Sequence, residues 1–192
     1  MRWKALKYNK EVIIYYLKLY ISNTENYTHL IPPQLDISNV LNTQVWDTEP
    51  LELTTYPSII LSNAGGNVNT GGLGDMVSEY YDQMGELKGY RYGGMYDLNF
   101  TLEIAALNTF TREFLTDLVI MALRVQLKRK IEAEGILIKD IRYSSESVVN
   151  FNNNKYYVST INLTTFSQWY EDIDFTSLDD VNISIGGNWY GI

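Results

Sequence analysis

The chain has 192 residues, 45% of them hydrophobic, which is enough for one folded domain with a sizeable core. It contains no cysteine, so disulfide bonds, thiolate metal sites and a cysteine nucleophile are excluded. Its formal net charge of −8 argues against a nucleic-acid-binding module, which normally carries a basic face.

The N-terminal part is predicted to be a helix followed by an irregular segment. Over residues 2–22, apolar side chains recur near helical spacing, although the β-branched and aromatic run 12–16 leaves a strand as the alternative. Lys10, Glu11 and Lys18 interrupt the apolar stretch and no cleavage site follows, so we expect no secretion signal and synthesis in the cytoplasm. Residues 23–55 contain three prolines and many Asn and Thr residues, and we expect a long irregular segment or arm.

The middle of the chain is predicted to hold two strands separated by loops. Residues 56–62 form a short apolar run that is typical of a buried strand, and the glycine-rich residues 63–75 are expected to be a loop. Residues 76–95 combine tyrosines with scattered glycines and are expected to be a loop or an irregular strand. From residue 96 to residue 106 apolar side chains recur at every second position, with polar side chains at 97, 99, 101 and 103 between them, which predicts a strand with one buried face.

A long helix is predicted next, with Asn108, Thr109 and Thr111 as candidate N-caps, and it is expected to end at Gly135. Its expected apolar stripe consists of Phe110, Phe114, Leu118, Met121, Ala122 and Val125, with Leu115 and Val119 beside it. The core prediction places Phe114, Leu118, Met121 and Val125 opposite Phe100, Leu102, Ile104, Ile161 and Leu163.

Two strands, over residues 136–143 and 155–169, are predicted to form a hairpin between residues 141 and 163. The predicted fold class is therefore α+β: a small, mostly antiparallel sheet packed by a long helix, with extended N- and C-terminal arms. We predict a single domain over residues 1–192. It divides into an N-terminal helix and arm (1–55), an α+β core (56–170) and an acidic C-terminal extension (171–192).

The sequence offers no arrangement typical of an enzyme, and we expect no catalytic, cofactor or metal site. His29 is the only histidine, and it lies in a polar loop with no nucleophile motif nearby. The glycine-rich loop lacks the lysine of a phosphate-binding loop and ends at Asp75, which would repel phosphate. The alternative interpretation is that the chain is a small ligand-binding domain or enzyme that uses this loop, residues 63–75.

Tyrosine and charge patterns instead point to contacts with other proteins. The chain has 16 tyrosines, whose apolar ring and polar tip suit surfaces that become buried in a complex; ordinary sheet packing is the alternative. Basic residues cluster within 124–130, and residues 171–192 are acidic, so the basic region of one copy could dock against the acidic region of another. The alternative is that both regions are ordinary solvated surface. The interface candidates are Tyr80, Tyr81, Tyr90, Tyr92, Arg124, Lys128, Arg129, Lys130, Asp179, Asp180, Trp189 and Tyr190.

The order and character of several segments resemble the tail-terminator and related neck proteins of tailed bacteriophages. The segments are YPSIILS (56–62), YDLNFTLEIAAL (96–107), TFTREFLTDLVIMAL (109–123), GILIKDIRY (135–143) and INLTTFSQWYEDI (161–173). The resemblance covers roughly residues 56 to 173 and includes no catalytic motif.

The resemblance implies a virion protein that forms a ring, a hexamer in this family, on the end of the tail tube. It implies partners among the neck and tail proteins: the chain itself, the tail tube, the head connector and the sheath. Neither a membrane nor sequence-specific nucleic acid is an expected partner. The helix over 2–22, the segment 23–55 and the region after 173 exceed the smallest members of the family. Another neck protein or a tube or sheath component therefore remains an alternative.

Overall fold

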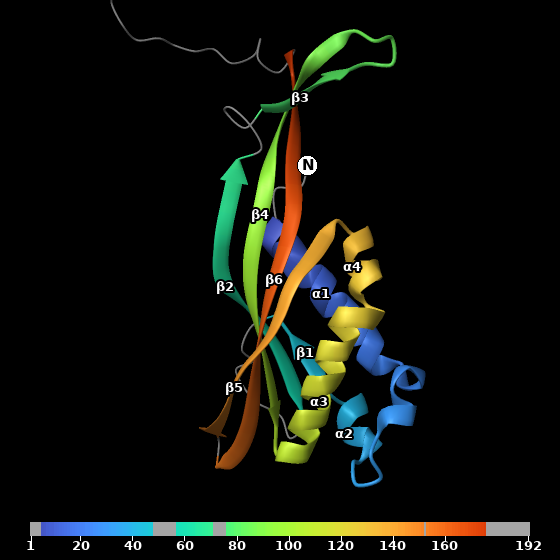
Figure 1. Cartoon of the computed structure of the whole chain (residues 1–192), viewed down its shortest axis with the longest axis vertical. Coiled ribbons are helices and arrows are strands. Elements are labelled where there is room, and N and C mark those ends of the chain that lie inside the picture. Colours follow the sequence, from blue (N-terminus) through green and yellow to red (C-terminus); the bar gives the residue numbers. More distant parts are fainter. Residues whose placement is uncertain (1–4, 48–56, 71–75, 152, 176–192) are drawn as a thin grey trace, which may run out of the picture.

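The computed structural model describes residues 5–47, 57–70, 76–151 and 153–175 (Figure 1). In chain order the elements are α1 (Ala5–Ser22), the 3-10 helices η1 (Thr24–Asn26) and η2 (Thr28–Leu30), α2 (Ile37–Leu41), β1 (Gln44–Trp46), β2 (Ser58–Thr70), β3 (Met76–Tyr81), β4 (Leu87–Ala106), α3 (Thr109–Met121), a π-helical turn (Ala122–Gln126), α4 (Lys128–Ala133), β5 (Ile136–Phe151) and β6 (Asn154–Asp174). The predicted α+β class is confirmed, because helices pack on a mostly antiparallel sheet.

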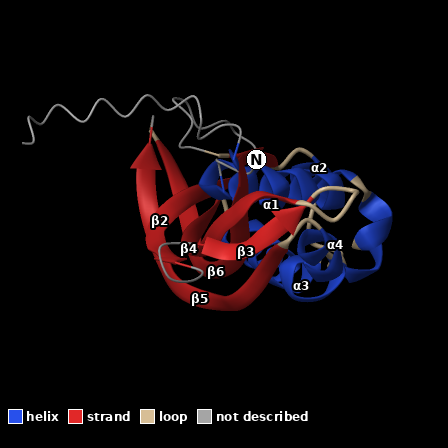
Figure 2. Ribbon diagram, turned by 90° about the horizontal axis from the view of Figure 1, so that it is seen from above, coloured by secondary structure: helices blue, strands red, loops and turns tan. Residues whose placement is uncertain are grey.

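The sheet has the strand order β1-β2-β4-β6-β5, and β3 pairs with the first part of β4. β1 and β2 are parallel, whereas the other described pairs are antiparallel. β4 and β6 form the long central ladder, which runs from Gly89 opposite Asp174 to Ala106 opposite Tyr157. Viewed from above, the described helices all lie against one face of this sheet (Figure 2).

The core lies between this helical layer and the central strands. The alternating strand predicted over 96–106 is confirmed: its apolar residues from Leu98 to Ile104 are buried, as are Ile161 and Leu163 of β6. Leu115, Leu118 and Val119 of α3 belong to the same cluster, together with Ile13 and Leu17 of α1. Among the described residues, none of the helices is long and apolar enough to cross a membrane.

The predicted N-terminal helix is confirmed over the described residues, and polar contacts hold it to the rest of the fold. The hydroxyl groups of Tyr8 and Tyr16 both donate to the carboxylate of Glu134, each at 3.0 Å. On the buried side of the helix, the Asn9 amide donates to the Ser167 hydroxyl at 3.0 Å. Helix α1 is therefore tied both to the end of α4 and to the sheet.

The expectation of an irregular arm over 23–55 is wrong for its described part. Residues 24–46 form two 3-10 helices, the short helix α2 and the strand β1. Tyr27 is fully buried and its hydroxyl donates to the carbonyl of Ile21, while Val40 and Val45 join the core. These scattered apolar residues pack under α1. Their burial therefore determines the conformation of a segment whose local composition favours a loop. Residues 48–55 lie outside the described residues.

The glycine-rich loop prediction is also wrong where the structure describes it. Residues 63–70 continue strand β2 and pair with β4 from Phe100 to Gly94. The register shifts between Asn63 and Gly65, which has a φ of +105°. Such a bulge accommodates glycine's left-handed conformation inside a paired strand. Residues 71–75 lie outside the described residues. Residues 76–95 are mostly strand, with register shifts between Met76 and Ser78 and between Tyr80 and Tyr81, which corresponds to the predicted irregular strand and not to a loop.

The long helix is present, but its buried face differs from the predicted stripe. Asn108 caps the helix, accepting the Thr111 amide at 2.7 Å, as expected. Phe110 is 41% exposed and Val125 is 65% exposed, so their assignment to the stripe is wrong. The π-helical turn rotates the following residues, and Leu123, Leu127 and Ile131 are buried instead.

The predicted hairpin is confirmed, with Ile141 opposite Leu163 and a turn that includes Asn153 at a φ of +63°. Both strands are longer than the sequence predicts. β6 runs on to Asp174, so residues 171–174, expected in the acidic extension, belong to the sheet. The later residues of that extension lie outside the described residues.

Candidate interaction surface

The β3–β4 hairpin projects beyond the helical layer at one end of the molecule (Figure 1). We call residues 76–92 the β-finger. Its turn is closed by the Asp82 carboxylate, which accepts the amide of Met84 at 2.8 Å and that of Glu86 at 3.0 Å. The hydrogen bond from the Glu86 amide is the main reason that the pKa of Asp82 lies below its usual range. Gly85 takes the left-handed conformation, at a φ of +82°.

Large apolar side chains are exposed along the β-finger, where no described helix covers the sheet. Met84 at the tip is 89% exposed. The others are Met76, Val77, Tyr81 and Leu87, which are between 38% and 55% exposed. Exposed apolar side chains gathered on one projecting element are typical of a protein–protein contact rather than of an isolated monomer. The β-finger is therefore the strongest candidate interaction surface among the described residues.

The structure brings the four tyrosines predicted as interface candidates together on the β-finger. Tyr81 is exposed, and its hydroxyl donates to Glu79, which raises the pKa of Tyr81. Tyr80, Tyr90 and Tyr92 are half-buried. Their placement on one hairpin follows from the pairing of β3 with the start of β4.

The base of the β-finger is fixed to β6. Arg91 and Asp172 face each other across the ladder, and the guanidinium also lies 4.8 Å from the centre of the Tyr170 ring. A Cβ on Gly94 would lie 2.4 Å from the carbonyl oxygen of Asn69 and 2.7 Å from Nε1 of Trp169. The glycine therefore lets the Trp169 ring cover the strand at this point, which stiffens the base of the finger.

The basic cluster lies on the helical layer and not on the β-finger. Arg124 is in the π-helical turn and donates to the carbonyl of Ile141 at 3.3 Å. Lys128 is 3.9 Å from Glu132 in α4. The remaining two basic candidates, Arg129 and Lys130, follow in the same helix. The candidates Asp179, Asp180, Trp189 and Tyr190 lie outside the described residues.

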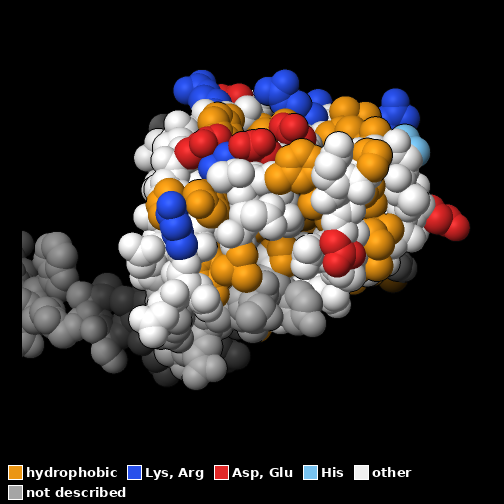
Figure 3. Space-filling view, turned by 90° about the horizontal axis from the view of Figure 1, so that it is seen from below, with side chains coloured by type: hydrophobic (Ala, Val, Ile, Leu, Met, Phe, Trp, Pro, Cys, Tyr) orange, Lys and Arg blue, Asp and Glu red, His pale blue; other side chains and the backbone are white. Residues whose placement is uncertain are grey.

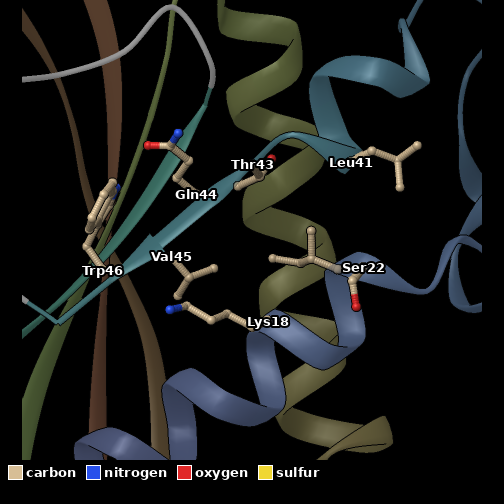
Figure 4. Close-up of a pocket in the computed structure, with 8 residues that line it drawn as sticks. Lys18, Ser22, Leu41, Thr43, Gln44, Val45 and Trp46 are labelled. Atoms are coloured by element: carbon tan, nitrogen blue, oxygen red, sulfur yellow. The ribbon is translucent and has the colours of Figure 1, made fainter.

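A groove that the sequence did not indicate lies between the end of α1 and strand β1 (Figure 4). Its volume is about 420 Å³. It is lined by Lys18, Ile21, Ser22, Leu41, Thr43, Gln44, Val45 and Trp46. These residues come from three elements that meet only in the folded chain, so no local motif could reveal the groove.

The end of the molecule opposite the β-finger has a mixed surface. Seen from below, hydrophobic side chains lie in small groups among acidic and basic ones (Figure 3). The single histidine, His29, is exposed in η2. No group of three or more His, Cys, Asp or Glu side chains in the described part of the chain is arranged to hold a metal ion.

The comparisons with known proteins find similarity to solved structures only. No protein-family model matches the chain, and no curated protein does. Among solved structures, the chain is similar to a chain from the virion of a native gene transfer agent particle. That similarity has a TM-score of 0.25 and 11% sequence identity, and covers 79% of this chain and 94% of that chain.

Proposed function

We propose that the chain is a structural virion protein of a tailed bacteriophage, a tail terminator whose ring caps the tail tube and joins it to the head connector. The β-finger is the observation that carries this proposal. A projecting hairpin with exposed Met and Tyr side chains has no evident use in a lone globular domain, whereas it suits a contact between subunits. The choice of family rests on the resemblance of segments within residues 56–173 to tail-terminator and neck proteins.

A ring requires heterologous contacts, in which one surface of a copy meets a different surface of the next, and closure fixes the copy number. The β-finger and the groove are two such different surfaces on one chain. We propose a hexamer with the tail tube, the connector and the sheath as candidate neighbours.

A non-enzymatic role is part of this proposal. The rival interpretation, a ligand-binding domain or enzyme that uses residues 63–75, needs free backbone amides to cradle a phosphate. Residues 63–70 instead pair with β4 as a strand with one bulge at its start, so the described part of that segment is occupied in sheet pairing. Another neck or tail component remains the alternative within the structural class.

The proposal is tested by measuring the mass of the purified chain by light scattering and imaging it in negative stain. We expect rings, either at high concentration or after addition of purified tail tubes. Met84→Glu should reduce ring formation, because it places a charge on the finger tip. Val125→Glu is the matched control, since Val125 is also exposed but lies on the helical layer. A chain that stays monomeric under all of these conditions, with or without tail tubes, would contradict the proposal.

A further inference from the structure

We infer that the tip of the β-finger of one copy docks into the groove between α1 and β1 of a neighbouring copy. This inference rests on the proposed self-assembly and identifies the two surfaces that meet. Within one chain, the finger projects at one end while β1 lies beside the helices farther down (Figure 1). The contact therefore needs a second copy.

The groove has the character of a docking site for an apolar hairpin. Its floor includes Ile21 and Val45, which are 3% and 5% exposed, while Leu41 and Trp46 at its rim are 40% and 38% exposed. Strand β1 is at the edge of the sheet and pairs only with β2 among the described strands. An open strand edge beside apolar side chains is a common site for adding an extended segment of a partner.

The chemistry of the finger tip matches that of the groove. Met84 is the most exposed of the large hydrophobic side chains that the structure describes, and the unbranched thioether of methionine adapts to irregular apolar surfaces. Leu87 and Tyr81, which pair with each other beside the turn, add further exposed apolar surface at the tip. The tip would bury Met84 and Leu87 against the groove floor.

Charge complementarity favours the same pairing. Residues 79–86 contain three acidic residues and no Lys or Arg, which gives the tip a formal charge of −3. Residues 7–18 of α1 contain three lysines and one glutamate, a formal charge of +2. Lys18 lies on the groove itself and has no ion-pair partner among the described residues. Opposite charges at the two surfaces set the orientation of docking and oppose contacts between two finger tips.

The absence of cysteine allows a direct test by site-specific cross-linking of the full chain. Met84→Cys is placed on the finger and Ser22→Cys in the groove; Ser22 is exposed, so the substitution changes little else. Matched controls are Val68→Cys, 60% exposed on β2, and Ser147→Cys, exposed on β5. Equal mixtures of two variants are oxidised under assembly conditions, and the covalent dimer is quantified while light scattering reports the oligomeric state.

We expect a covalent dimer from Met84→Cys mixed with Ser22→Cys, and only background from mixtures in which a control replaces either partner. If oligomers form but this pair cross-links at the control level, the groove is not the docking site, although the proposed ring stands. Preferential cross-linking of Met84→Cys with itself would also overturn the inference, because the tips would then meet each other. A chain that never associates would contradict both the inference and the proposed function.

Charge reversal supplies an independent readout. Lys18→Glu or Glu86→Lys alone should weaken self-association by about fivefold, the equivalent of roughly 1 kcal/mol for an exposed charge pair. Combining both reversals in one chain should restore association, because the opposite charges then face each other again. Additive weakening in the double variant would contradict the proposed pairing.

Discussion

Arg91 and Asp172 form a two-point ion pair across the β4–β6 ladder, with Nε 2.6 Å from Oδ1 and Nη2 2.9 Å from Oδ2. The two residues also face each other in the strand register. The hydrogen bond from Arg91 holds the pKa of Asp172 below its usual range. This pair lies at the base of the β-finger, next to the last β3–β4 pair, Met76 opposite Tyr92, so it couples the finger to β6.

Asp172→Asn should loosen the base of the β-finger without unfolding the protein. Both side chains are more than a third exposed, so the global free energy of unfolding should change little. Amide hydrogen exchange should accelerate locally at residues 89–92, which pair with this part of β6. Asp140→Asn is a matched control, since Asp140 forms a local ion pair with Arg142 away from the finger. Equal exchange in both variants would contradict the coupling.

Gly94→Ala should destabilise the fold by about 1–3 kcal/mol, the usual cost of forcing extra volume into a packed site. The new methyl group would collide with the Asn69 carbonyl and the Trp169 ring, at 2.4 Å and 2.7 Å. Urea unfolding measures the loss of free energy, and near-UV circular dichroism reports the displaced indole. Met95→Ala, at an exposed neighbouring position, controls for a general effect on the strand. Equal stability of the two variants would mean that the glycine is not required here.

Leu118→Ala should cost about 2–5 kcal/mol of the free energy of unfolding, because Leu118 is 3% exposed and the truncation leaves a cavity. Val125→Ala should change it by less than about 0.5 kcal/mol, since Val125 points away from the core. Denaturant titration of both variants compares two positions that the apolar stripe had assigned to one face. Similar losses at the two positions would contradict the rotation produced by the π-helical turn.

Glu146→Gln should flatten the dependence of stability on pH. The Tyr143 hydroxyl donates to Glu146 at 2.6 Å, and the buried Arg112 guanidinium lies 3.0 Å away. The hydrogen bond, aided by Arg112, lowers the pKa of Glu146 in the folded state. Its stabilising contribution is therefore present above the pKa of the unfolded chain and is lost as the pH falls through the folded pKa.

The check compares the free energy of unfolding at neutral pH with that near pH 4, around the ordinary pKa of a glutamate. The wild-type protein should lose more stability on acidification than the glutamine variant. Glu25→Gln, an exposed carboxylate outside this network, serves as control. An unchanged pH dependence in Glu146→Gln would show that the pair contributes nothing to folding.

Sequence patterns predicted the elements that are held by regular periodicity. The period of two over 96–106 corresponds to the buried and exposed faces of β4, and Asn108, one of the three N-cap candidates, caps the helix. The predicted helical stripe is wrong at Phe110 and at Val125. At Val125 the reason is that a period of 3.6 residues was extended through a π-helical turn, which holds an additional residue. Val125 thereby moved to the surface.

Long-range pairing explains most of what the sequence did not indicate. Residues 63–70 have the composition of a loop, yet the edge of β4 supplies hydrogen-bond partners that local preference cannot anticipate. The four tyrosines were chosen as interface candidates from their residue type alone and stay predictions. Met84 became a candidate only through its exposed position at a projecting turn. The groove was not predicted either, because its lining residues come together only in the folded chain.

The topology of the β-finger also sets the time at which it can be completed during synthesis. Residues 89–93 of the finger and its base pair with residues 170–174, which the ribosome adds after every other described strand and helix. A nascent chain can pack α1 and α3 before that point, but the base of its finger still lacks a pairing partner. The base of the β-finger is therefore the last part of the described sheet whose pairing can be completed.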